Sequence, residues 1–139
     1  MKQITSIVFL LLFQIGFSQT IFGKWKTIDD KSGKEKGIVE IFEKNGKIYG
    51  KIIDILEKEH KHQKCKKCEG EDKNKPILGL IIIKGLTKNG NFYDGGKVLD
   101  PKNGKKYDCK ITLEGKEKLN VRGYIGIALV GRSQTWIRL

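Results

Sequence analysis

The sequence predicts an all-β fold in which eight antiparallel strands close as an up-and-down barrel. Apolar residues recur mostly at every second position, which is the period of a half-buried strand. The breaks between these runs contain Asn-Gly pairs or Pro with Gly, as tight turns require. Helical patterns are almost absent, and closure into a barrel removes exposed strand edges. A flattened β-sandwich is the alternative.

The first three strands are expected at residues 22–28, 37–43 and 48–56. A polar run at 29–33 ends the first strand, and Asn45-Gly46 suits the positive backbone angles of a hairpin turn after the second. Residues 57–75 are charged and nearly free of apolar side chains, so they cannot bury a face. We expect a long loop there.

The second half of the chain predicts five further strands. An almost continuous apolar run at 77–86 is typical of a buried strand, and turns at 88–90 and 100–104 separate it from strands at 92–99 and 105–113. The last two strands are expected at 119–124 and 133–139. The segment 125–131 between them is apolar and glycine-rich, and we expect a buried turn or a short helical plug.

The N-terminus has the three parts of a secretory signal. Lys2 is basic, residues 7–15 are apolar, and Gly16 and Ser18 precede the expected cleavage before Gln19. We therefore expect residues 1–18 to be a signal peptide and residues 19–139 to be one domain, soluble in the periplasm or outside the cell. The formal charge is +12, and it is +11 without Lys2, the one charged residue of the first 18. Most of that charge is lysine interleaved with acidic residues, as a solvated surface requires. Nucleic-acid binding would favour exposed aromatics alternating with basic residues on one sheet face, and export argues against it, so we predict no nucleic-acid partner.

Two short segments at the ends of the mature chain resemble those of lipocalin-type barrels. Gly23-Lys24-Trp25 opens the first strand, and Trp136-Ile137-Arg138 lies in the last. In the lipocalin, fatty-acid-binding and avidin group, a first-strand Gly-x-Trp packs beneath an arginine from the final strand. The resemblance implies a lipocalin-like barrel closed at one end by Trp25 and Arg138, because a guanidinium can stack on an indole.

A closer resemblance covers the mature chain through a series of segments in order. They are Gly23 to Trp25 with Asp29-Asp30, Gly50 to Ile52, Cys65 to Cys68, Pro76 to Leu80, Gly95 to Pro101, Gly104 to Cys109, Arg122 to Gly126 and Gly131 to Trp136. On these segments the chain resembles the bacterial family DUF2147, exported domains of unknown function. That family has no settled activity, so the resemblance implies a fold and no reaction.

Histidine and cysteine cluster in the expected loop. His60, His62, Cys65 and Cys68 could together hold zinc or copper, but both pairs sit on one lysine-rich segment. In an oxidising compartment the Cys-x-x-Cys pair favours a disulfide that staples the loop. Redox exchange would need the first cysteine at a helix start, which the pattern lacks. We predict a Cys65–Cys68 disulfide, no metal and no cofactor, with Cys109 as a buried free thiol.

The sequence favours binding over catalysis. Ser32 and Ser133 lack a nucleophile motif, so we predict no enzyme activity. An eight-stranded barrel can hold one small apolar ligand, and we predict binding of a small hydrophobic or amphipathic molecule in the cell envelope. The alternative is a structural or surface-interaction module whose basic, disulfide-stapled loop touches an anionic envelope surface. The candidate ligand-binding residues are Trp25, Tyr49, Tyr107, Arg122, Tyr124 and Arg132.

Overall fold

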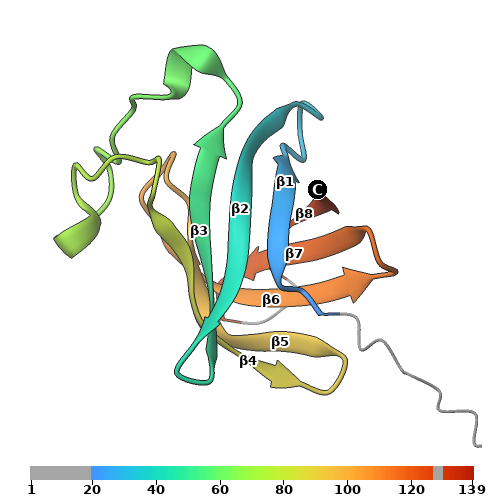
Figure 1. Ribbon diagram of the computed structural model, residues 1–139. Helices are drawn as coiled ribbons and strands as arrows, with labels where there is room; N and C mark the ends of the chain where they lie inside the picture. The colour runs from blue at the N-terminus through green and yellow to red at the C-terminus, as the bar shows by residue number, and fades with distance from the viewer. Residues whose placement is uncertain (1–19, 127–129) are drawn as a thin grey trace, which may run out of the picture.

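The computed structural model describes residues 20–126 and 130–139. Eight antiparallel strands form one closed barrel in chain order, as the sequence predicts, and the sandwich is excluded (Figure 1). β8 returns to β1 through the pairs Trp25–Arg138 and Lys26–Ile137. The strands are β1 Gly23–Ile28, β2 Glu35–Lys44, β3 Lys47–Ile55, β4 Ile81–Asn89, β5 Phe92–Leu99, β6 Lys106–Glu114, β7 Lys118–Tyr124 and β8 Gly131–Arg138.

Most strand limits lie within two residues of the expected ones, but β4 is an exception. Its predicted start at residue 77 is wrong, because Ile77 to Leu80 form a turn in which the Leu80 N–H bonds the Ile77 carbonyl at 3.1 Å. Both side chains pack toward the core from the loop, so the apolar run is continuous although the strand is not. The connection between β3 and β4 thus runs to residue 80 and contains two short 3₁₀ helices, η1 Lys58–His60 and η2 Gly70–Asp72.

The core follows the two-residue period of the strands. Trp25, Ile83, Ile111 and Leu119 are fully buried and come from four different strands. Trp136 is buried from β8. The first four side chains fill one end of the barrel interior, and Trp136 borders the hollow that occupies the other end.

The buried turn or short helical plug expected at 125–131 is only partly described, and its described ends are exposed. Ile125 is 64% exposed and Val130 is 61% exposed, and Gly131 already belongs to β8. Residues 127–129 lie outside the described residues, as does the predicted signal at 1–18. Within the described residues, no helix has the length and apolar character needed to cross a membrane.

Candidate functional site

A cavity of about 710 Å³ occupies one end of the barrel. Its walls come from the inner faces of the strands, and its mouth lies where the β1–β2, β3–β4, β5–β6 and β7–β8 connections meet. This volume falls in the range of ligand sites that enclose a small molecule. The apolar wall residues include Val39, Ile52, Ile55, Ile77, Ile82, Val98, Leu99, Val121 and Trp136.

The opposite end is closed by Arg138. Its guanidinium carbon lies 4.2 Å from the ring centre of Trp25, which is fully buried. Its three nitrogens donate hydrogen bonds to the carbonyl oxygens of Thr20 at 2.7 Å, Phe22 at 3.1 Å and Lys116 at 2.7 Å. The Trp25 indole N–H donates to the carbonyl of Ile21 at 2.9 Å. The Arg138 side chain therefore joins residues 20–22, the β6–β7 turn and the Trp25 indole at the closed end of the barrel.

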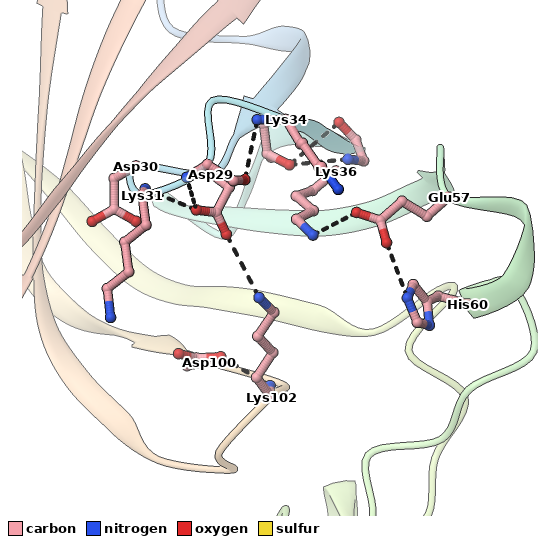
Figure 2. A network of polar contacts seen from close by, with 12 residues as sticks. Asp29, Asp30, Lys31, Lys34, Lys36, Glu57, His60, Asp100 and Lys102 are labelled. Atoms are coloured by element: carbon pink, nitrogen blue, oxygen red, sulfur yellow. Dashed lines mark hydrogen bonds and ion pairs between the residues drawn. The ribbon is translucent and has the colours of Figure 1, made fainter.

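The mouth is held by ion pairs between neighbouring connections (Figure 2). Lys102 lies 3.6 Å from Asp29 and links the β5–β6 and β1–β2 connections. Arg132 donates through Nε to Asp30 at 2.9 Å, with a second bond from its Nη2, and links β8 to the same β1–β2 connection. The backbone N–H groups of Ser32 and Lys31 hold the pKa of Asp29 far below its usual range.

The Asp30–Arg132 pair also shifts both of its members. The hydrogen bond from Arg132 lowers the pKa of Asp30, and the same bond raises the pKa of Arg132. Both groups therefore remain charged through the neutral range.

A series of hydrogen-bonded side chains lines the mouth beside β2. The Lys36 ammonium donates to Glu57 at 2.5 Å, and the other Glu57 oxygen lies 3.0 Å from His60 Nε2 (Figure 2). The bond to Lys36 lowers the pKa of Glu57, and the bond to Glu57 raises the pKa of Lys36. Gln63 Nε2 lies 2.6 Å from His60 Nδ1. All four side chains line the cavity, so the first turn of the long loop forms part of its wall.

The rest of that loop is anchored by a disulfide between Cys65 and Cys68, as the sequence predicts. Both cysteines are buried, and the Cys65 backbone bonds Asn74 and Lys75 at the far end of the loop. Cys65 Sγ lies 3.6 Å from the carbonyl oxygen of Pro101 in the β5–β6 connection. The disulfide therefore packs the loop against the β5–β6 connection, which is part of the rim, the ring of strand connections around the cavity mouth.

Gly104 makes this approach feasible. Its φ is +71°, and a Cβ at this position would lie 1.9 Å from the Lys67 carbonyl oxygen. Such a distance is far inside van der Waals contact, so only glycine fits here. The loop and the β5–β6 connection thus pack backbone against backbone.

Three of the six predicted ligand-binding residues line the cavity, namely Tyr107, Tyr124 and Arg132. Trp25 lies beneath the core at the closed end, where it contacts Arg138. The prediction that Tyr49 is one of the ligand-binding residues of the barrel interior is wrong. Ile48, Gly50 and Ile52 bury the inner face of β3, so Tyr49 points outward and stacks on Phe42 with ring centres 5.9 Å apart.

Arg122 also lies away from the cavity lining. It alternates with the inward Val121 and donates to Ser133 Oγ at 3.1 Å across the β7–β8 pair. The sequence interpretation missed Lys36, Glu57 and Gln134, all of which line the cavity. No local motif marks these residues, because only the barrel register brings them together.

The weak metal candidates do not form one site. Cys65 and Cys68 are joined to each other, which removes both thiolates as ligands. His62 is exposed, whereas His60 is paired with Glu57 at the rim. Among the described residues, the group with ligand atoms within 4.8 Å of one another is Glu57, Glu59 and His60, and exposed acidic groups commonly gather without an ion.

A closed eight-stranded barrel with a cavity at one end, and an arginine over a first-strand tryptophan at the other, defines a lipocalin-like protein. Residues 23–138 match the model of a family described as uncharacterized proteins conserved in bacteria (DUF2147), and the chain belongs to that family. Among curated proteins, none matches the chain.

A solved structure is also similar to this chain. It is described as protein HP1028 from the human pathogen Helicobacter pylori, which belongs to the lipocalin family. The two chains are 26% identical with a TM-score of 0.76, and the match covers 86% of this chain and 83% of the other. The lipocalin-like fold predicted from the sequence is thereby confirmed.

Proposed function

We propose that this protein is an exported, non-catalytic carrier that holds one small hydrophobic or amphipathic molecule in the barrel cavity. The observation that carries the proposal is the cavity of about 710 Å³, whose strand walls are mostly apolar and whose mouth is lined by charged side chains. Such a site excludes water from an apolar body and leaves a polar end near solvent. A ligand with an apolar chain and one polar group fits both regions.

The composition of the lining supports binding rather than catalysis. Among the described residues that line the cavity there is no serine or cysteine. His60, the one histidine among them, is paired with Glu57 and Gln63 rather than with a nucleophile. The arrangement supplies shape and hydrogen-bond partners, and it lacks the nucleophile–base pair that covalent catalysis uses.

Export is the second part of the proposal and rests on the N-terminal pattern of residues 1–18. The Cys65–Cys68 disulfide supports it, because structural disulfides persist in oxidising compartments. Expression of the full chain in an exporting bacterial host should yield a periplasmic or secreted protein whose N-terminal residue is Gln19. An uncleaved cytoplasmic product would contradict export.

The ligand proposal is tested by titrating the purified mature protein with a fluorescent long-chain fatty-acid analogue. Dodecanoate and dodecylamine, which share an apolar chain and differ in head group, serve as competitors. We expect saturable binding at one site per protein. Native mass spectrometry of the freshly purified protein should show whether a ligand of similar chemistry is carried from the host.

A variant that fills the cavity tests whether the probe binds inside it. Val98 lines the cavity from β5 and is only half-buried, so Val98→Phe can extend into the empty volume. We expect at least about tenfold weaker probe binding, a loss of about 1.4 kcal/mol. Thr135→Phe, a similar change on the exposed outer side of β8, is the control and should bind normally. Equal binding by wild type and Val98→Phe would place the probe elsewhere and overturn the proposal.

A further inference from the structure

The connection between β7 and β8 has an unusual composition for its place in the fold. Residues 125–130 read Ile-Gly-Ile-Ala-Leu-Val, without one polar side chain. Every other connection between consecutive strands contains at least one polar or charged residue. A strand connection at a protein surface is normally polar, so an apolar one needs a specific reason.

The structure shows that both ends of this connection face solvent. Ile125 is 64% exposed and Val130 is 61% exposed, and the Ile125 N–H donates to the Val130 carbonyl at 3.2 Å. Both residues also lie at the cavity mouth. Among the described residues, the other exposed large hydrophobic side chains are Leu78 in the long loop and Leu139 at the C-terminus. Two of these four exposed side chains therefore lie at the entrance to the cavity.

Exposed lysines flank this apolar pair on both sides. In the closed barrel, the β7–β8 connection lies between the β1–β2 and β5–β6 connections at the same end. Lys31 and Lys34 are exposed on the first of these, and Lys105 is exposed on the second. None of the three forms an ion pair with another described residue. Figure 2 shows Lys31 extending away from the ion-paired Asp29.

We propose that the mouth of the barrel docks on an anionic lipid bilayer. Ile125 and Val130 enter the boundary between head groups and acyl chains, and Lys31, Lys34 and Lys105 meet lipid phosphates. Apolar side chains bordered by lysine match the interfacial region of a bilayer, where both kinds of side chain gain free energy. Docking in this orientation would place the cavity entrance against the lipid.

A protein partner fits these observations less well. Two exposed apolar side chains form a small patch, whereas stable protein interfaces bury about 800 Å² on each partner. Lysine is also depleted in such interfaces but is attracted to anionic lipid surfaces. The proposal goes beyond ligand binding, and each of the two can fail without the other.

The test is flotation of the mature protein, stripped of any ligand, with phosphatidylcholine vesicles that contain or lack phosphatidylglycerol. We expect binding to the vesicles with phosphatidylglycerol, and weaker binding to pure phosphatidylcholine or at high salt. The double variant Ile125→Ser/Val130→Ser should bind at least about tenfold more weakly, because it removes the inserted apolar area. Leu139→Ser, which removes an exposed apolar side chain beside Arg138 at the closed end, should bind as wild type does.

A charge-matched pair of triple variants separates docking from general attraction to a basic protein. Lys31→Gln/Lys34→Gln/Lys105→Gln removes three charges at the mouth and should weaken binding by about tenfold or more. Lys44→Gln/Lys47→Gln/Lys88→Gln removes three exposed charges on β2, β3 and β4, away from the mouth, and should weaken binding much less. Equal losses in the two triple variants would overturn the proposal, as would an absence of vesicle binding or full binding by Ile125→Ser/Val130→Ser.

Discussion

Removal of Arg138 should destabilise the protein more than removal of any other single surface cation. The side chain donates to three backbone carbonyls and covers the indole of Trp25. Two of these bonds lie at the surface and one is partly buried. We assign about 0.5 to 1 kcal/mol to each surface bond, about 1.5 to the partly buried one, and about 1 to the cation–π contact. Arg138→Ala should therefore cost about 3.5 to 4.5 kcal/mol.

The assay is equilibrium unfolding in urea, followed by the fluorescence of Trp25 and Trp136. Arg138→Lys keeps the charge but cannot reach three carbonyls, so its stability should fall between those of wild type and Arg138→Ala. Lys24→Ala changes an exposed residue of β1 and controls for loss of a positive charge.

Two results would refute this reasoning. One is an Arg138→Ala free energy of unfolding within about 0.5 kcal/mol of wild type, which is the effect expected of an ordinary surface position. The other is full stability in Arg138→Lys, because the charge alone would then account for the effect and the geometry of the fork would not matter.

Three further predictions concern other parts of the structure. Burial raises the pKa of the Cys109 thiol to about 12, so Ellman's reagent at pH 8 should detect no thiol in the folded protein and one per chain after unfolding without reductant. Gly104→Ala should cost at least about 2 kcal/mol more in a urea melt than Gly115→Ala, since both sites have positive φ but Gly115 has open space around its Cβ. The bond from Arg132 that lowers the pKa of Asp30 stabilises the folded state at pH values above the ordinary carboxyl pKa. This contribution is lost as the pH falls through the lowered pKa. Asp30→Asn should therefore reduce the loss of stability below about pH 4, and an unchanged acid melt would show that the bond to Arg132 contributes nothing.

The two-residue period of the sequence was sufficient for the barrel, but it was less reliable for the direction of individual side chains. In β6, Cys109 and Ile111 alternate with Lys106 and Lys110, and the structure buries the first pair. In β3, an aromatic residue is compatible with either face, so the residue type alone does not tell whether Tyr49 points into the barrel. Lys51, two residues later, shares its face and is the signal that points outward.

The rim could not be predicted because its partners are distant in sequence. Lys36 and Glu57 are 21 residues apart, and Asp30 and Arg132 are 102 apart. Each pair forms only after the strands have closed in one register. The alternation of apolar residues indicates which side chains of a strand face inward, but it does not indicate which connections come together at the end of the barrel. The β3–β4 connection shows the same limit. Its disulfide could be predicted from the Cys-x-x-Cys spacing and the expected export to an oxidising compartment. Its contact with the β5–β6 connection depends on Gly104, and in the sequence this glycine looks like part of an ordinary turn.

The two ends of the barrel are held by interactions of different kinds, and this difference indicates which end opens more easily. At the closed end, a buried indole and bonds to backbone carbonyls join β8 to the segment that precedes β1, and these interactions depend little on pH or on salt. At the mouth, side-chain ion pairs join the connections, and solvent and salt weaken such pairs. Local opening is therefore least costly at the mouth, because its ion pairs can separate without exposing the core. A ligand would enter and leave at that end, which is also where the exposed Ile125 and Val130 lie.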